Sequence, residues 1–313
     1  MYTPSLVSIG IASYNNASYI EQMLESVMNQ TYPSIELIIV DDCSTDNSVE
    51  VITNWLARTS YPAIFVRHAT NQGIVKAFNE CRANAHGEYV SWVGSDDALA
   101  PDMIAKTVTE FEHQGTDCAA VYADCRIIDS SGCEIAPSFL KYFNPAFADN
   151  PPQSNLIVPL LNGFYLPTLT TTIRHSTLDS VGEYDLSLYS EDLDMWLRLS
   201  RHFKFAYLPA NLGAYRVHNA SAMNTNRLAL NDTYFRIYRK GYFEGPEEWA
   251  AARRNLINNA EHYYASKGPA AWEKLWYAFR ESGSGKTGLF WVLARLGISY
   301  DIVRKVRAFK GRN

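Results

Sequence analysis

The sequence lacks the features that mark membrane-spanning, secreted and nucleic-acid-binding proteins. No apolar run reaches the roughly 18 residues that a membrane-spanning helix needs. The N-terminus has neither the basic segment nor the apolar core of a signal peptide. The five cysteines are an odd number without metal-ligand spacing, so they indicate free thiols in a reducing compartment. The net charge of -5 argues against nucleic acid as a partner. We therefore expect a cytoplasmic protein.

What the sequence does contain is apolar residues arranged as alternating strands and helices. Apolar residues make up 47% of the 313 residues, enough for one large α/β domain plus an appendage. Short runs of strand type are separated by segments whose apolar residues recur at helical spacing. The first four predicted strands are Leu6–Ala12, Ile35–Val40, Ala63–Val66 and Tyr89–Val93. Their short connections predict βαβ units with right-handed crossovers and a parallel sheet.

Beyond residue 97 the pattern is more varied, and it ends in a helical region. The predicted elements are a helix after Pro101, strands at Cys118–Tyr122, Cys125–Ile128 and Thr168–Ile173, a helix from Glu191, and strands at Phe205–Leu208 and Gly213–Val217. Residues 136–153 are rich in Pro, Asn and aromatic side chains, which predicts a long loop. We therefore expect an α/β domain at 1–225 and a C-terminal helical extension at 226–313.

Two adjacent carboxylates, Asp96 and Asp97, follow directly on the fourth predicted strand. In an open α/β sheet, ligands bind just beyond the carboxyl ends of the strands. Two anions in such a place repel each other and lose hydration, which is unfavourable unless a cation compensates them. Their oxygen ligands suit Mg²⁺ or Mn²⁺. The alternative is a plain turn in which Asp97 caps the next helix, a position that Asp favours.

An ordered series of short motifs resembles glycosyltransferase family 2, whose members have the GT-A fold. The matching segments are Val7–Asn15, Glu36–Asp46, Asn71–Gly73 with Ala77 and Asn79, Gly87–Val90, Ser95–Asp97, Gly182–Asp185, Glu191–Asp192 and Tyr215–His218. One such motif would be weak evidence, but the set in this order is specific. The resemblance covers roughly residues 5–222. It implies a Rossmann-like GT-A domain with a nucleotide-binding part at about 1–97 and an acceptor part at about 98–225.

The resemblance implies a metal site after the fourth strand. Asp97 matches the metal-binding Asp of the family's DxD-like motif, and Asp96 matches the neighbour that faces the ribose and the metal-bound waters. His218 matches a further ligand of metal or phosphate, although by itself it would be an ordinary surface histidine. Many relatives carry Asp-x-Asp where this chain has Ser95-Asp96-Asp97, which leaves fewer carboxylates for the ion. The implied cofactor, Mn²⁺ or Mg²⁺, neutralises charge that develops on a nucleoside diphosphate leaving group.

Nucleotide binding is implied for residues that follow the first three strands. Asp42 resembles the carboxylate that accepts the N3–H of uracil or thymine. Ala12 and Tyr14 resemble the residues that flank the base. Gly73 would let the backbone approach the nucleotide. Lys76, one helical turn further on, is either a point charge for the diphosphate or a solvated helix lysine, and the sequence favours neither interpretation.

Asp192 resembles the catalytic base of inverting members of the family, with Glu191 beside it. An inverting transfer needs one carboxylate to take the proton of the acceptor hydroxyl as that oxygen attacks the anomeric carbon. The other interpretation is that both residues complement the dipole of the helix that they open. Both interpretations can hold, because a helix start also fixes a carboxylate rigidly. Trp196 on the same helix is predicted to be a core residue, with the wall of an acceptor pocket as its alternative role.

These features predict a metal-dependent, inverting glycosyltransferase. The resemblance implies that it moves a sugar from a UDP- or dTDP-sugar to a glycan or a lipid-linked glycan, as in the assembly of bacterial O-antigen or capsule. Two alternatives remain open at this point. One is a retaining transferase on the same fold, and the other is a catalytically silent module that only binds a nucleotide sugar.

Residues 289–313 concentrate positive charge in an otherwise acidic chain. Their basic residues are Arg295, Arg304, Lys305, Arg307, Lys310 and Arg312, and their single acid is Asp301. The apolar residues Ile302, Val303, Val306 and Phe309 fit one helical face. Such a helix either lies on an anionic membrane or packs on the catalytic domain or on a second subunit. The first interpretation predicts a peripheral protein on the cytoplasmic face of the inner membrane.

Overall fold

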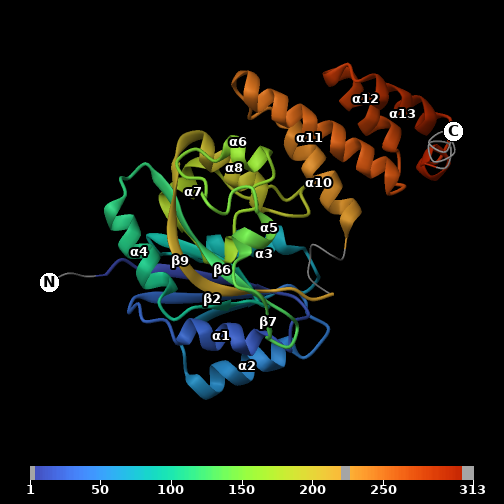
Figure 1. Cartoon of the computed structure of the whole chain (residues 1–313). Coiled ribbons are helices and arrows are strands. Elements are labelled where there is room, and N and C mark those ends of the chain that lie inside the picture. The colour runs from blue at the N-terminus through green and yellow to red at the C-terminus, as the bar shows by residue number, and fades with distance from the viewer. Residues whose placement is uncertain (1–3, 220–225, 305–313) are drawn as a thin grey trace. The chain divides into compact units, whose positions relative to one another are not determined.

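The computed structural model describes residues 4–219 and 226–304 and divides the chain into two compact units (Figure 1). The first unit is Met1–His218 and the second is Asn219–Asn313. The sequence predicts the domain boundary after residue 225, whereas the two compact units divide after His218. Residues 220–225, which lie between these two positions, fall outside the described residues. The first unit holds the sheet, and every element assigned in the described part of the second is a helix.

The strands described in the first unit form one mixed sheet. They are β1 (Val7–Ser13), β2 (Ile35–Asp41), β3 (Ala63–Arg67), β4 (Tyr89–Gly94), β5 (Ala98–Leu99), β6 (Cys118–Ile128), β7 (Glu134–Ala136), β8 (Thr171–Arg174) and β9 (Lys204–Arg216). Their order is β3-β2-β1-β4-β8-β6-β9-β5, with β7 paired to β6. The parallel sheet predicted from the first four strands is confirmed for β1 to β4. Beyond β4, β8 runs antiparallel to both of its neighbours.

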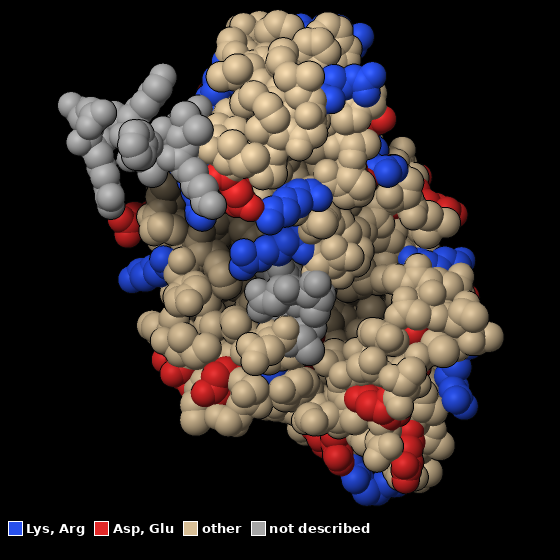
Figure 2. All heavy atoms as spheres, turned by 90° about the vertical axis from the view of Figure 1, so that its right-hand side faces the viewer, with Lys and Arg blue, Asp and Glu red and all other residues tan. Residues whose placement is uncertain are grey.

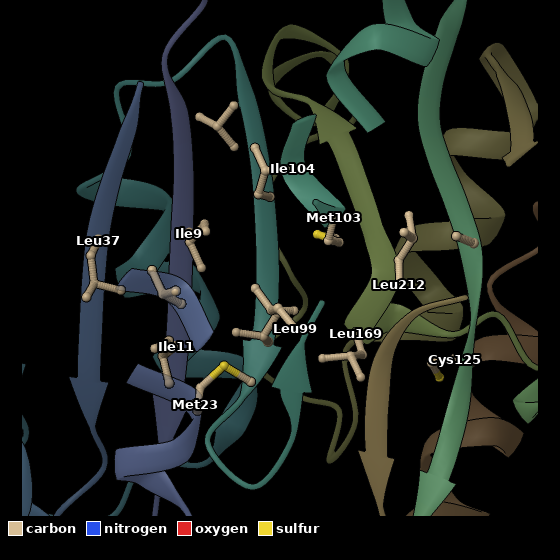
Figure 3. Close-up of a cluster of buried hydrophobic side chains, with 14 of the residues drawn as sticks. Ile9, Ile11, Met23, Leu37, Leu99, Met103, Ile104, Cys125, Leu169 and Leu212 are labelled. Atoms are coloured by element: carbon tan, nitrogen blue, oxygen red, sulfur yellow. The ribbon is translucent and has the colours of Figure 1, made fainter. Parts of the chain in front are cut away.

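Helices cover both faces of this sheet. They are α1 (Ile20–Met28), α2 (Ser48–Thr59), α3 (Ile74–Ala83), α4 (Met103–His113), α5 (Phe139–Phe143), α6 (Ile157–Leu161), α7 (His175–Val181) and α8 (Asp192–His202). Alternate residues of β1 face opposite ways. Ile9 and Ile11 join the apolar cluster that contains Met23 of α1 (Figure 3). On the other face, a Cβ at Gly10 would come within 2.8 Å of Cys81 on α3. The missing side chain therefore lets α3 pack closely on the sheet.

Two long strands replace pairs of shorter ones that the sequence predicts. β6 runs through both Cys118–Tyr122 and Cys125–Ile128, and β9 runs through Phe205–Leu208 to Arg216. The two strands pair with each other, and the register jumps from Ala123 opposite Leu208 to Asp124 opposite Asn211. Pro209 lies in that bulge, where a missing N–H is tolerated.

Some short elements are not predicted by the sequence at all. β5, β7 and α7 are each too short to give a clear hydrophobic period. The predicted loop at residues 136–153 contains the helix α5, whose start is capped because the hydroxyl of Ser138 accepts the N–H of Lys141. β5 and β7 extend the sheet by pairing with β9 and β6, whereas α5 and α7 lie beside β6 and β8.

The second unit has a core of its own. Its described helices are α10 (Arg227–Arg239), α11 (Gly245–Ala265), α12 (Ala271–Ser282) and α13 (Gly285–Arg295). Buried residues from all four helices meet in one cluster that includes Phe235, Leu256, Leu275 and Phe290. No helix among the described residues is both long enough and apolar enough to cross a bilayer.

The sequence predicts one apolar helical face in the C-terminal tail, and the structure gives two of its residues different environments. Val303 packs against the core of the helical unit, whereas Ile302 is exposed. Val306 and Phe309 lie outside the described residues. The expectation that these four side chains share one face is therefore wrong for Ile302 and Val303.

Candidate active site

The carboxyl ends of β1, β2 and β4 bring several turns of the chain together. β1 lies in parallel register between β2 and β4. Two backbone hydrogen bonds extend this register beyond the strands. The N–H of Asp42 donates to the carbonyl of Ser13 (2.8 Å), and the N–H of Ser95 donates to the carbonyl of Ala12 (3.2 Å). Segments far apart in the sequence therefore become neighbours at the edge where α/β proteins bind ligands.

Asp42, the centre of the predicted nucleotide subsite, is nearly buried and accepts hydrogen bonds from the loop after β3. Its Oδ2 accepts the N–H of Gly73 (2.7 Å), and its Oδ1 accepts the N–H of Gln72 (2.8 Å). The same Oδ1 lies 2.7 Å from Nδ1 of His68. One carboxylate therefore fastens the loop after β3 to the end of β2. Gly73 has a φ of 88°, and nothing lies within 4 Å of the place where its Cβ would be, so the backbone there borders open space.

Two buried polar atoms near this carboxylate have no hydrogen-bond partner among the described residues. They are Nε2 of His68 and Oγ of Ser13. Buried polar groups are nearly always paired, so each of these atoms suits a partner that the chain itself does not supply. His68 contacts the side chain of Asp42, and the carbonyl of Ser13 accepts the backbone N–H of Asp42. These two atoms would be available to form hydrogen bonds with a ligand at the strand ends. The sequence predicts a binding role for neither residue.

The other predicted nucleotide residues differ in exposure. Ala12 is nearly buried at the end of β1, whereas Tyr14 is 44% exposed and has a free ring face for stacking. Lys76 places its Nζ 3.6 Å from Oε2 of Glu80, one turn along α3. Such exposed pairs stabilise a helix by only about 0.3–0.5 kcal/mol, so the ammonium is weakly held and both interpretations of Lys76 remain open.

The end of β9 holds the adjacent carboxylates. Nε2 of His218 lies 2.9 Å from Oδ2 of Asp96, and the N–H of Arg216 donates to Oδ1 of Asp97 (2.8 Å). The Arg216 side chain is buried, donates from Nε to the carbonyl of Asp96 (2.7 Å), and lies 4.7 Å from the ring centre of Tyr19. The structure thus pairs His218 with Asp96, whereas Arg216 bonds to both Asp96 and Asp97 and so fixes the turn that they form.

Asp97 has the electrostatic environment of an uncompensated carboxylate pair. Burial, followed by the charge of Asp96, holds its pKa well above the usual range. Asp97 does not cap α4, which begins after Asp102 without a side-chain cap. Within the described ranges, no three His, Cys, Asp or Glu side chains converge into a ready-made metal cage. Asp97 and His218 are the residues that would hold a divalent cation, which would supply positive charge beside a bound diphosphate.

Glu191 and Asp192 open α8, as the sequence predicts. Oδ1 of Asp192 accepts the N–H of Leu193 (2.7 Å) and the hydroxyl of Ser190 (3.0 Å). Burial and the charge of Asp192 raise the pKa of Glu191 to about 8, and burial also raises the pKa of Asp192. Because the two carboxyls are coupled, the raised pKa values belong to the pair, which retains a proton at neutral pH more readily than free carboxyls do. Trp196 on the same helix is buried in the core.

Tyr215 lies within electrostatic reach of both halves of the site. Burial raises the pKa of its hydroxyl, and the charges of Asp97, Asp96 and Asp192 raise it further. The predicted metal carboxylates and the predicted base are therefore close enough to act on one side chain. Tyr215 and Arg216 belong to a matched motif, yet their residue types in a β-favouring run indicate only an ordinary strand.

The loop that leads into α8 is held from two sides. On one side, the amide of Asn79 on α3 donates to the carbonyl of Tyr184 (2.9 Å) and accepts its N–H (3.0 Å). On the other side, the guanidinium of Arg198 on α8 donates to the carbonyls of Val181 (2.6 Å) and Glu183 (2.8 Å). The helix that begins at the nucleotide subsite therefore also positions the loop before the carboxylate pair.

Comparison with known proteins identifies the family. Residues 8–160 match the family model described as "Glycosyl transferase family 2". The chain belongs to glycosyltransferase family 2. A chondroitin synthase of Pasteurella multocida is 34% identical over 203 residues, which are 65% of this chain and 20% of that protein. An uncharacterized glycosyltransferase of Rickettsia felis is 31% identical over 209 residues, which are 64% of this chain and 32% of that protein. This chain thus spans a third or less of the length of each of these two relatives.

Solved structures confirm the predicted GT-A fold. The structure of Staphylococcus aureus TarS in complex with UDP-GlcNAc has a TM-score of 0.60 at 18% identity, covering 92% of this chain and 79% of that one. A Pyrobaculum calidifontis mannosyltransferase in complex with GDP-Man and Mn²⁺ has a TM-score of 0.61 at 17% identity, covering 94% and 80%. At these identities the similarity concerns the fold alone.

Proposed function

We propose that this family 2 chain is a metal-dependent, inverting glycosyltransferase. It moves a sugar from a UDP- or dTDP-sugar to a glycan or lipid-linked glycan acceptor. The observation that carries the proposal is the arrangement at the sheet edge, where Nε2 of His218 lies 2.9 Å from Oδ2 of Asp96 and the N–H of Arg216 donates to Oδ1 of Asp97. Donor activation and proton removal would thus have separate carboxylates at one site.

The nucleotide would lie against the ends of β1 and β2. Asp42 is oriented there by three donors, and Nε2 of His68 and Oγ of Ser13 are buried without partners among the described residues. TarS was solved with UDP and with UDP-GlcNAc, whereas the mannosyltransferase holds GDP-Man. Because the same fold accepts different nucleotides, the choice of UDP or dTDP rests on Asp42 and its family match.

The leaving diphosphate would lie beside Asp97 and His218. A divalent cation bound there, such as the Mn²⁺ in the mannosyltransferase complex, would neutralise the negative charge that builds on the diphosphate. The raised pKa of Asp97 supports this role, since a cation would relieve the repulsion between its charge and that of Asp96. Arg216 would keep both carboxylates in place through its bonds to Asp97 and to the carbonyl of Asp96.

Asp192 would act as the base. The acceptor hydroxyl gives its proton to this carboxylate while its oxygen bonds to the anomeric carbon, opposite to the leaving group. The bond from that carbon to the diphosphate breaks, and its electron pair leaves with the diphosphate. The raised pKa of Asp192 increases its affinity for this proton. The anomeric configuration of the product, read by NMR, separates this inverting reaction from a retaining one.

The test is transfer and donor hydrolysis by wild type and by Asp192→Asn, each with Mn²⁺ and with chelator. Loss of a general base lowers turnover by about 100-fold to 10,000-fold, while UDP affinity should stay near that of wild type. Asp179→Asn, on a carboxylate that is 62% exposed, is the matched control and should behave as wild type. If wild type with Mn²⁺ turns over no member of a UDP- and dTDP-sugar panel that it binds, the chain is a silent binding module and the proposal is wrong.

A further inference from the structure

We propose that the solvent-exposed side of α12 and α13 docks on an anionic membrane surface. We call this surface the α13 face and define it as Leu289 and Val292 of α13, Leu296 at its C-cap, Trp276 of α12, and Ile302. Membrane docking is a separate property from the proposed transfer reaction. Only the suggestion that docking brings the enzyme to a lipid-linked acceptor rests on that function.

The α13 face gathers large apolar side chains that water would not favour. Leu289 is 53% exposed, Val292 42% and Leu296 69%, and their spacing of three and four residues puts them on one side of the helix. Trp276 is also exposed, and its ring lies 4.7 Å from that of Trp291. Single exposed apolar residues are ordinary, but a contiguous group of them marks an interaction surface.

The α13 face is distinct from the side of α13 that packs on the core of its unit. The opposite side of α13 is already used, because Phe290 is completely buried and packs near Tyr264 and Tyr300. α13 is therefore apolar on two sides, one turned to the core of its unit and one turned to solvent. Burying a helix in its own domain requires only the first side.

Positive charge borders the α13 face. Arg295 lies on one flank, with its guanidinium 4.5 Å from the ring centre of Trp272. On the other flank, the charge of Lys286 is compensated by its ion pair with Glu261. Figure 2 shows one face of the molecule, on which Lys and Arg are interspersed with Asp and Glu among larger areas of other residues. Residues 289–313 hold six Lys or Arg and one Asp, a net charge of +5, so the rest of a chain that totals -5 carries -10.

The shape and the charge together favour a membrane over a protein partner. Two cavities of the helical unit are lined from α10, α11, α12 and the residues before α12, and neither includes a residue of α13. A partner helix or peptide would need a groove, whereas a lipid surface needs only exposed Leu and Trp side chains beside basic ones. A second copy would bring its own +5 against this +5, and like charges oppose that contact.

The experiment measures sedimentation of the full chain with vesicles at low salt. We expect binding to equimolar phosphatidylglycerol and phosphatidylcholine, little binding to phosphatidylcholine alone, and release as salt rises. The double variant Leu289→Ser, Leu296→Ser should lose at least tenfold in partition. The matched control is Ile135→Ser, Leu186→Ser, which changes two apolar residues of similar exposure (48% and 61%) in the first unit and should bind as wild type.

Two further readouts make the outcome decisive. Brominated acyl chains should quench the fluorescence of wild type more than that of Trp276→Phe, because Trp276 would lie at the lipid surface. Donor hydrolysis should be the same in both double variants, which separates failure of docking from failure of the proposed enzyme. The proposal is overturned if the full chain ignores anionic vesicles at low salt, if both double variants bind equally, or if the α13 variant only dissociates a dimer.

Discussion

Asp97 combines burial with a neighbouring negative charge, and both raise its pKa. Asp97→Asn removes the charge but keeps an oxygen that can accept the N–H of Arg216. We expect transfer to fall by at least about 100-fold, because a group that offsets developing charge is lost. We also expect the melting temperature at neutral pH to stay the same or rise, since an ionised carboxylate with a raised pKa destabilises the fold.

Manganese binding separates the metal role from a purely structural one. In the presence of UDP, electron paramagnetic resonance should show weaker Mn²⁺ binding by Asp97→Asn than by wild type. Asp102→Asn, on an exposed carboxylate paired with Lys106, is the control and should bind Mn²⁺ normally. Equal Mn²⁺ affinity in all three proteins would refute the metal assignment.

Glu191 and Asp192 make a second prediction at the residue scale, because they form a coupled pair. Glu191 has its pKa raised to about 8, so it is protonated below that pH and ionised above it. Glu191→Gln fixes the neutral state. We expect the acid limb of kcat/KM to stay in place, because that limb reports Asp192, while an inflection near pH 8 disappears. If the acid limb moves instead, the shared proton belongs to Asp192 and the roles are reversed.

Single residues also show how far the sequence could lead. Asp97 and His218 could be predicted because each follows a strand and matches a motif, and the structure places both at the turn that Arg216 fixes. Arg216 belongs to the same matched motif as His218, but its role could not be found in this way, and His68 belongs to no matched motif. Their importance comes from one unpartnered nitrogen and from several bonds across the sheet, and neither feature is visible in a residue type or a spacing.

At the scale of elements, α3 connects the two halves of the site. It begins at the nucleotide subsite, and Asn79 on it holds the loop before α8 through two hydrogen bonds to Tyr184. Asn79→Ala should lower the free energy of unfolding by about 1–3 kcal/mol. It should also lower kcat by roughly 10-fold to 100-fold through misplacement of the base, with UDP affinity little changed.

Denaturant unfolding, steady-state kinetics and UDP titration check the Asn79 prediction. Asn84→Ala is the control on the same helix, because its amide bonds only to the carbonyl of Glu80 (2.8 Å) within α3 and its cap. It should change stability slightly and kcat hardly at all. A loss of UDP affinity in Asn79→Ala as large as the loss of kcat would mean that α3 does not act through the loop.

Elements also mark the limits of sequence reading. The first four strands and their helices could be predicted because each is short, apolar and bounded by turn residues. β6 and β9 could not, since a strand interrupted by Pro209 continues only if a bulge against the partner strand absorbs it. Pairing between distant strands, rather than local pattern, decided the length of both.

At the scale of the whole molecule, the two units have separate apolar cores. We therefore expect two thermal transitions rather than one. Leu275→Ala, which removes a fully buried side chain from the second core, should lower only one of them and so identify it.

UDP with Mn²⁺ should raise the other transition, because Asp42, Asp97 and His218 all lie in the first unit. Ligand at 100 times its Kd stabilises the folded state by about 2.7 kcal/mol, which for a unit of this size is a shift of roughly 5–10 °C. Chelator should reduce the shift, and Asp42→Ala should reduce it further because the base loses its acceptor. GDP should shift wild type less than UDP does, since a site built on one hydrogen-bond pattern disfavours another base. A larger shift with GDP, or a shift confined to the transition that Leu275→Ala lowers, would refute the nucleotide assignment.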